Sequence, residues 1–254
     1  MQIENHNELC EVSDFFSSSA RDWTPASLRT VVQVLYMPAS NNPEISARCG
    51  LVLSDEEHLR ADRFVTESGK AHFIERRAFR RYCAALALGS LGSLGSLGLQ
   101  PPLSKIVFQE TEKGHPYLPD HEELWFSFSA CATGFLGAWS STHAVGVDIE
   151  DLSRDLDAAS LADRYFTESE AKLVRARVGA AQLRTFLQYW TLKEAALKSI
   201  GEGLPFGLDA FEFDLFPNPT VLRAPGGICS AAGLNAQLIG EADYSAALVI
   251  RQIN

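Results

Sequence analysis

Basic residues are scarce in this 254-residue chain, in which 22 Lys and Arg stand against 32 Asp and Glu and the formal net charge is −10. Such a charge repels nucleic acid and anionic membranes, so we expect neither as the main partner. A secretory start is also lacking, because residues 1–16 carry acidic side chains and no apolar core. The five cysteines form no CxxC pair, which favours free thiols in the cytoplasm over disulfides or zinc.

Long apolar runs are almost absent as well. Residues 83–104 (CAALALGSLGSLGSLGLQPPLS) are the one uncharged stretch long enough to suggest a membrane span. Its GSL repeats and the Pro101-Pro102 pair disfavour a helix interior. We therefore interpret the stretch as a helix end that runs into a low-complexity connector.

One short motif occurs twice, as ADRFVTES at 61–68 and as ADRYFTES at 162–169. A helix start used twice would explain it, because Thr167 and Glu170 have the spacing of a capping box and Thr66 is also suited to cap a helix. Duplication of a larger unit is the alternative. With 46% hydrophobic residues, the chain can bury the core of one large domain or of two of about 125 residues.

The order of expected elements favours duplication. Each half reads strand, repeated motif, helix, strand, at 30–39, 61–68, 75–88 and 105–110 and again at 144–150, 162–169, 183–201 and 210–216. We predict two similar α/β halves, 1–143 and 144–254, related by a pseudo-two-fold axis. Ligand sites favour the cleft between such halves.

Strand 144–150 (AVGVDIE) places Val145, Val147 and Ile149 on one face and two carboxylates, Asp148 and Glu150, on the other. The two carboxylate residues are about 7 Å apart at their Cα atoms, the rise of two strand residues. An exposed acidic strand face would account for this pattern equally well.

Helix 183–201 carries a third carboxylate, Glu194, within its apolar arc. A carboxylate there is costly unless it is paired or binds a cation. An ion pair with Lys198 at i,i+4 is one explanation. The other is that Asp148, Glu150 and Glu194 converge on Mg²⁺, which prefers oxygen ligands and leaves positions open for phosphates.

Residues 58–82 are basic within an acidic chain. Three acidic residues there accompany Arg60, Arg63, Lys70, Arg76, Arg77, Arg80 and Arg81. Many such runs belong to helices whose basic face is exposed to solvent. The alternative, more specific hypothesis is that the guanidinium groups bind phosphate.

These motifs resemble the Sfp-type 4′-phosphopantetheinyl transferases, from about Val31 to the C-terminus. The family pattern is G-[IV]-D-[IV]-E followed by W-x-x-K-E-[AS]-x-x-K-x-x-G, and it is complete here at Gly146, Asp148, Glu150, Trp190, Lys193, Glu194, Lys198 and Gly201. The resemblance implies a tandem pair of similar α/β halves. It would make the repeated motif a remnant of duplication.

The resemblance also implies a reaction, the transfer of the 4′-phosphopantetheine arm of coenzyme A to a serine of an acyl, peptidyl or aryl carrier protein. Adenosine 3′,5′-bisphosphate is released. Mg²⁺ on Asp148, Glu150 and Glu194 would neutralise the pyrophosphate. Glu194, or a metal-bound water near it, would help to deprotonate the serine, and Lys198 would steady the leaving phosphate.

Coenzyme A contacts follow from the same resemblance, which assigns them to Arg60, Arg77, His115, Ser129, Lys193 and Lys198. The chain departs from the family at two places. Ser-His-Ser is here Ser129-Ala130-Cys131, and Gly-Lys-Pro is Gly114-His115-Pro116, with Lys113 able to replace the lost charge. A missing phosphate contact would weaken coenzyme A binding by about 1–3 kcal/mol.

We therefore expect an active, monomeric, cytoplasmic enzyme that binds coenzyme A through altered phosphate contacts. Its acidic carrier would dock on residues 58–82 or on the 160–185 region. Two rival hypotheses remain. The first is a non-catalytic protein that binds coenzyme A or docks a carrier, and the second is a metal-dependent hydrolase of the coenzyme A pyrophosphate.

Overall fold

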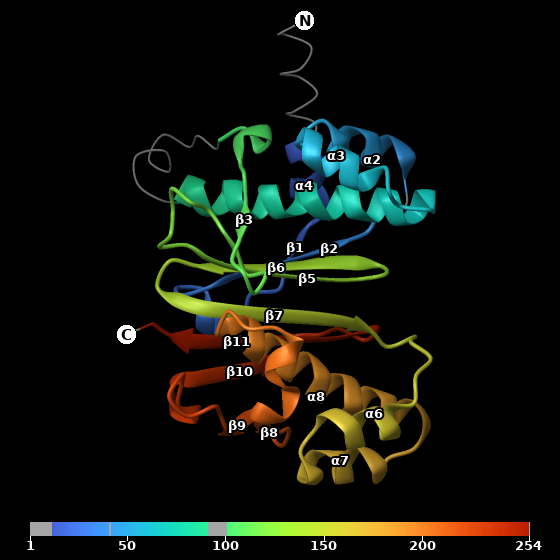
Figure 1. Ribbon diagram of the computed structural model, residues 1–254, viewed down its shortest axis with the longest axis vertical. Coiled ribbons are helices and arrows are strands. Elements are labelled where there is room, and N and C mark those ends of the chain that lie inside the picture. Colours follow the sequence, from blue (N-terminus) through green and yellow to red (C-terminus); the bar gives the residue numbers. More distant parts are fainter. Residues whose placement is uncertain (1–11, 41, 91–100, 254) are drawn as a thin grey trace, which may run out of the picture.

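The computed structural model describes residues 12–40, 42–90 and 101–253. Two antiparallel sheets lie face to face, with helices on both outer sides (Figure 1). The first sheet has the order β1-β2-β6-β5, formed by Arg21–Asp22, Gln33–Pro38, Gly134–Ser140 and Trp125–Cys131. The second has the order β10-β11-β7, formed by Leu234–Leu238, Tyr244–Gln252 and His143–Asp151.

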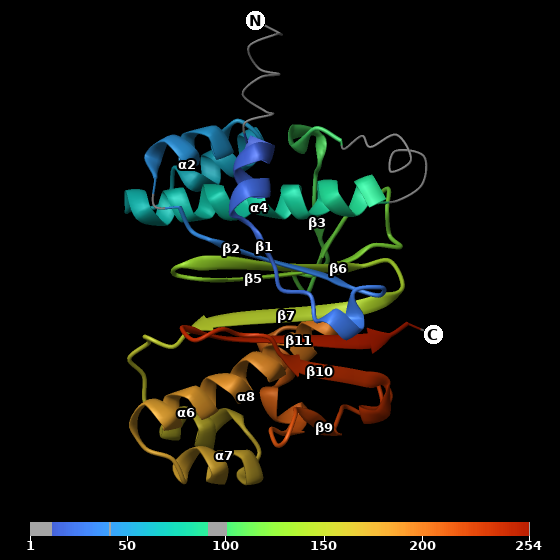
Figure 2. The same ribbon diagram turned by 180° about the vertical axis from the view of Figure 1, so that it is seen from behind.

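The helices divide between the two sheets. On the outer side of the first sheet, α4 (Glu67–Ser90) lies next to the strands, and α2 (Pro43–Gly50) and α3 (Asp55–Ala61) lie beyond it. On the outer side of the second sheet, α8 (Gly179–Ser199) lies next to the strands, and α6 (Ala158–Tyr165) and α7 (Glu168–Arg175) lie beyond it, as the reverse view shows (Figure 2). Short antiparallel pairs complete the described chain: β3 with β4 (Gln109–Glu110, Pro116–Tyr117) and β8 with β9 (Glu212–Asp214, Thr220–Arg223).

Apolar side chains fill the space between the sheets. Val145, Val147 and Ile149 of β7 are buried there, together with Val34 of β2 and Leu136 of β6. The predicted apolar face of strand 144–150 is thus confirmed. Because this core closes the space between the sheets, polar groups from the two sheets meet at the sheet edges, where β5 approaches β7.

The other face of β7 packs against α8 at very short range, and Gly146 makes this approach possible. A Cβ atom on Gly146 would lie 1.8 Å from the Ala195 carbonyl oxygen and 2.6 Å from the Ser199 backbone nitrogen. Backbone cannot yield to such an overlap as a flexible side chain can. Gly146 therefore brings the helix that carries Glu194 and Lys198 against the strand that carries Asp148.

Gly146→Ala is expected to lower the free energy of unfolding by about 3 kcal/mol or more, because α8 must move away from β7. Urea unfolding followed by circular dichroism measures this. Gly226→Ala is the matched control, because nothing lies within 4 Å of its added Cβ. Equal stability of the two variants would contradict the close packing.

The long elements were predicted correctly and the short ones less well. Strand 30–39 is β2, helix 75–88 lies within α4, and helix 183–201 is α8 with shifted ends. The predicted strands at 105–110 and 210–216 were too long, since only Gln109–Glu110 and Glu212–Asp214 are paired. A longer ladder would place residues 105–108 opposite residues 118–121, and Pro119 there has no N–H to donate.

The repeated motif joins two helices in both places. It connects α3 to α4, where Thr66 Oγ1 accepts the Gly69 N–H at 3.2 Å, and α6 to α7, where Glu170 Oε2 accepts the Thr167 N–H at 3.0 Å. Both threonines therefore serve helix starts. In the second half, however, the helix that follows is the short α7 and not the long α8.

The uncharged run begins as a helix, as predicted, since α4 continues to Ser90. Residues 91–100 of the expected connector lie outside the described residues. Within the described ranges, no helix combines the length and apolarity needed to cross a membrane.

Candidate active site at the β5–β7 edge

Strands β5 and β7 belong to different sheets, and side chains of β5 bind the β7 edge. Trp125 Nε1 donates to the Val145 carbonyl at 2.8 Å, and Ser127 Oγ accepts the Val147 N–H at 3.0 Å. These bonds satisfy backbone groups that no neighbouring strand reaches. They also fix which residues of the two strands lie opposite each other.

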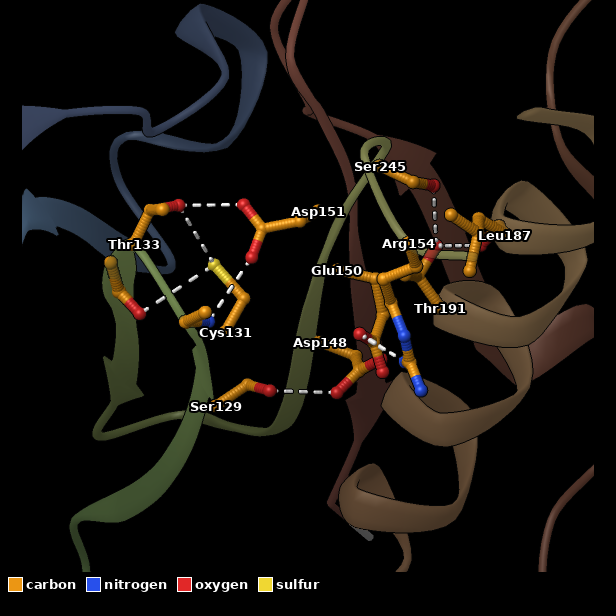
Figure 3. Close-up of polar contacts among 12 residues, drawn as sticks. Ser129, Cys131, Thr133, Asp148, Glu150, Asp151, Arg154, Leu187, Thr191 and Ser245 are labelled. Atoms are coloured by element: carbon orange, nitrogen blue, oxygen red, sulfur yellow. Dashed lines mark hydrogen bonds and ion pairs between the residues drawn. The ribbon is translucent and has the colours of Figure 1, made fainter. Parts of the chain in front are cut away.

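The same edge contact continues to the end of β7 (Figure 3). Asp151 accepts a hydrogen bond from Thr133 Oγ1 at 2.6 Å and one from the Ala132 N–H at 3.1 Å, so it holds the β5–β6 turn. Thr133 Oγ1 also lies 3.2 Å from Tyr244 Oη, which accepts a hydrogen bond from Tyr36 Oη at 2.8 Å. Residues 125–133 are therefore anchored along the strand that carries the acidic residues.

Asp148 lies at the centre of this contact. Its Oδ1 accepts hydrogen bonds from Ser129 Oγ and from Lys198 Nζ, each at 2.7 Å (Figure 3 shows the serine bond). Its Oδ2 is buried and has no partner among the described residues. A buried carboxylate oxygen without a donor is costly. This oxygen is therefore suited to bind a ligand or a cation.

Two further carboxylates act on Asp148 electrostatically. Burial, and then the charge of Asp148, raise the pKa of Glu150, while Arg154 Nη1 donates to Glu150 Oε2 at 2.6 Å (Figure 3). Burial raises the pKa of Glu194 to about 7, and Asp148 and Glu150 add to the rise although Lys198 opposes it. This acidic cluster has more negative charge than its own cations balance.

The alternative of a Glu194–Lys198 ion pair is wrong, because Lys198 binds Asp148 and the Val147 carbonyl. In the part of the chain that the structure describes, no side chain donates a hydrogen bond to Glu194. Within the same ranges, no group of three His, Cys, Asp or Glu side chains is arranged to hold a metal ion. The three carboxylates are electrostatically coupled without forming a closed metal site.

A second polar cluster lies on α4. Arg60, Arg77, Arg81, Glu57 and Glu110 line a cavity of about 270 Å³. The predicted phosphate-binding residues Arg60 and Arg77 thus lie together, and both guanidinium groups face the Phe73 ring, at 5.6 and 5.3 Å from its centroid.

The arginines of α4 in this cluster are not a solvated helix face, whereas Arg60 on α3 is exposed. The side chains of Arg77, Arg80 and Arg81 are only 13%, 12% and 6% exposed, and the Nε atom of each is buried without a hydrogen-bond partner among the described residues. Docking of the carrier on residues 58–82 stays a prediction, although Arg80 offers little exposed surface to it. Buried guanidinium groups with spare donors suit phosphate.

His115 does not replace the charge of the family's lysine. Its ring lies 4.2 Å from the Trp125 ring, and burial, followed by the charge of Arg80, lowers its pKa to about 4. The imidazole is therefore neutral at pH 7. Lys113, the expected substitute, forms an ion pair with Glu202 instead.

Lys193 lies away from the cluster around Asp148, which corrects the expectation that it contacts coenzyme A. Its ammonium is fully buried, pairs with Glu170 at 2.7 Å, and donates to the carbonyls of Leu208 and Phe211. The side chain follows α8 toward the β8 side of the second core because it lies about 100° around the helix from Glu194. Lys193 is a structural residue in this arrangement.

Sequence reasoning missed several residues that position the site, namely Trp125, Ser127, Asp151 and Arg154. The spacing of Ser127 and Ser129 was a usable signal, because residues i and i+2 of a strand lie on the same face. Nothing in the sequence shows that β7 of the other sheet faces them.

The structure thus combines coupled carboxylates and a lysine at the edge between two sheets with buried arginines on a helix, groups whose chemistry suits cations and phosphates. A family model for the 4′-phosphopantetheinyl transferase superfamily matches residues 144–249. 4′-Phosphopantetheinyl transferase HetI of Nostoc sp. is 34% identical over 186 residues, 72% of each chain. The chain belongs to this superfamily and is an enzyme of this class.

Other similarities are shorter. 4′-Phosphopantetheinyl transferase gsp of Aneurinibacillus migulanus is 29% identical over 128 residues, 48% of this chain and 49% of that protein. The solved holo-[acyl-carrier-protein] synthase of Thermotoga maritima aligns at 23% identity with a TM-score of 0.35, over 44% of this chain and 64% of that one. That structural match is too weak to support an argument.

Proposed function

We propose that this enzyme transfers the 4′-phosphopantetheine arm of coenzyme A to a serine of an acyl, peptidyl or aryl carrier protein in a Mg²⁺-dependent reaction. Adenosine 3′,5′-bisphosphate is the second product. The observation that carries the proposal is the bonded set Ser129–Asp148–Lys198, with the coupled Glu150 and Glu194 beside it. Membership of the superfamily supports the same reaction.

Asp148, Glu150 and Glu194 would hold the Mg²⁺ ion. The buried Oδ2 of Asp148, which has no partner among the described residues, fits an oxygen-seeking cation, as do the burial and, after it, the carboxylate repulsion that raise the pKa of Glu150 and Glu194. When bound, Mg²⁺ supplies charge neutralisation at the pyrophosphate. Residues 148, 150 and 194 come from β7 and α8, which Gly146 holds together.

Side chains of the protein would carry out the remaining steps. Glu194, or a water held near it, would help to take the proton of the incoming serine hydroxyl. Lys198 Nζ already bridges Asp148 and the Val147 carbonyl, and its charge would stabilise the departing phosphate. Arg60 and Arg77 would bind coenzyme A phosphates, with Ser129 and the neutral His115 as uncharged contacts.

We further propose that residues 1–143 and 144–254 are duplicated halves related by a pseudo-two-fold axis, in a cytoplasmic monomer. The chain passes from the first sheet to the second between Ser140 and His143, next to the proposed boundary. Each sheet is covered by one long helix, α4 or α8, which supports the duplication.

Intact-mass spectrometry of an apo carrier protein, incubated with the enzyme, coenzyme A and Mg²⁺, tests the proposal. We expect the carrier to gain the mass of one phosphopantetheine arm, and we expect EDTA to prevent the gain. The rival is a binding protein without turnover, motivated by Ala130 and Cys131 in place of the family's His and Ser. Coenzyme A binding without any modified carrier would establish that rival, whereas free phosphopantetheine without a carrier would indicate the hydrolase.

A further inference from the structure

Two carboxylates, Glu57 and Glu110, lie among the arginines of this cluster, and they differ in how many hydrogen bonds they accept and in how exposed they are. Glu57 accepts the Ser54 N–H at 3.0 Å at the start of α3 and is bound by Arg81 Nη1 and Nη2 at 3.1 and 2.6 Å. Its side chain is 17% exposed. Glu57 is thus part of the framework, because its loss would uncap a helix and leave Arg81 unpaired.

Glu110 has looser contacts. It ends the two-residue strand β3, its side chain is 46% exposed, and its Oε1 lies 3.3 Å from Arg80 Nη1 and 3.7 Å from Arg77 Nη1. Both contacts use a single carboxylate oxygen, unlike the two-point grip of Arg81 on Glu57. Ion pairs with one exposed partner contribute little to stability, so this carboxylate can leave at low cost.

The surrounding positive charge is in excess. Arg60 of α3 and Arg76 and Arg77 of α4 lie 5.3–5.7 Å from the centroid of one aromatic ring, that of Phe73. Arg80 and Arg81 follow on α4. Burial and then the charge of Arg77 lower the pKa of Arg80 to about 10. Guanidinium groups crowded in this way are stabilised more by a phosphate than by a single carboxylate.

We propose that Glu110 is a displaceable counter-ion, which in the free enzyme occupies Arg80 and shares Arg77 with Glu57, and which yields both arginines to a phosphate of coenzyme A. This inference rests on the proposed function for the identity of the ligand. Because coenzyme A must displace Glu110 in order to bind, this carboxylate lowers the affinity of the enzyme for coenzyme A. It also eases release of the phosphate-bearing product by returning to the arginines. Glu110 thereby acts as a residue that sets affinity for the substrate.

Glu110→Gln tests this inference, with Glu112→Gln as the matched control. Glu112 lies in the turn after β3, is exposed, and has no partner among the described residues, so its substitution changes the net charge equally without touching the arginines. Calorimetric titration with coenzyme A at low salt should give a Kd about 5- to 10-fold lower for Glu110→Gln and within about twofold of wild type for Glu112→Gln. Glu110→Ala should also tighten binding.

Unchanged or weaker binding in Glu110→Gln, with thermal unfolding like that of wild type, overturns the counter-ion role. An equal gain in both variants also overturns it, because overall charge would then be the cause. Carrier modification measured on the same proteins separates the two proposals. Tighter coenzyme A binding without modification of any carrier refutes only the transferase, and modification with unchanged affinity refutes only the role of Glu110.

Discussion

Asp148→Asn is expected to lower the rate of carrier modification by about 100- to 1,000-fold. The amide keeps the shape of the side chain but removes the charge that pairs with Lys198 and the anionic oxygen Oδ2 that would face the cation. Lys198 then loses its carboxylate partner, so the two charges that act on the pyrophosphate are both misplaced. Intact-mass spectrometry at several time points measures the rate.

Two controls accompany this variant. Asp155→Asn removes the same charge from an exposed loop position that has no partner among the described residues, and should retain wild-type activity. Coenzyme A binding by Asp148→Asn should weaken much less than the rate falls, since Arg60 and Arg77 are untouched. Full activity of Asp148→Asn in the presence of Mg²⁺ would refute the proposed chemistry.

Glu194→Gln is expected to stabilise the metal-free protein by roughly 2 kcal/mol above pH 7, after allowance for the partial exposure of the side chain. The pKa of Glu194 is raised from 4.5 to about 7 in the folded protein. Between these values the folded state binds more protons than the unfolded state, so the free energy of unfolding falls as the pH rises. The glutamine variant lacks this fall, and the two proteins should differ least near pH 4.

Urea unfolding in EDTA at pH 5 and pH 8 measures the effect, with Glu122→Gln as an exposed control that has no partner among the described residues. Adding Mg²⁺ at pH 8 should then stabilise the wild type and leave Glu194→Gln nearly unchanged, because a cation bound only by the folded state raises stability. This readout needs no turnover. Equal stabilisation of both proteins by Mg²⁺ would exclude Glu194 as a ligand.

Predictions from sequence patterns with a fixed period agreed with the structure. The alternation in β7 predicted which face enters the core, and the helical period of α8 placed Glu194 within the apolar arc, where burial raises its pKa. Both follow from local geometry, in which strand residues alternate and helix residues advance by about 100°. The burial of the arginines on α4 could not be predicted in this way, because it depends on what packs against that helix.

The sequence did not predict correctly which charged side chains pair with each other. Lys198 and Glu194 have the spacing of an ion pair, yet Lys198 binds Asp148, 50 positions away in sequence. Lys193 matches a family motif, yet its ammonium pairs with Glu170 in the core. Lys113 was expected to face a phosphate and instead meets Glu202. A charged side chain pairs with whichever opposite charge the fold brings near, and that neighbour is seldom close in sequence.

The sequence by itself determined the family, the α/β character, the faces of β7 and the identity of the acidic residues, because these depend on residue type and short-range spacing. Only the tertiary structure decided that β5 is bound to β7 through side chains, that Asp148 Oδ2 has no donor among the described residues, and that Glu110 occupies the arginines of α4. Each of these joins segments from different elements. Their meeting is set by how the sheets and helices pack, with Gly146 admitting α8 to the face of β7.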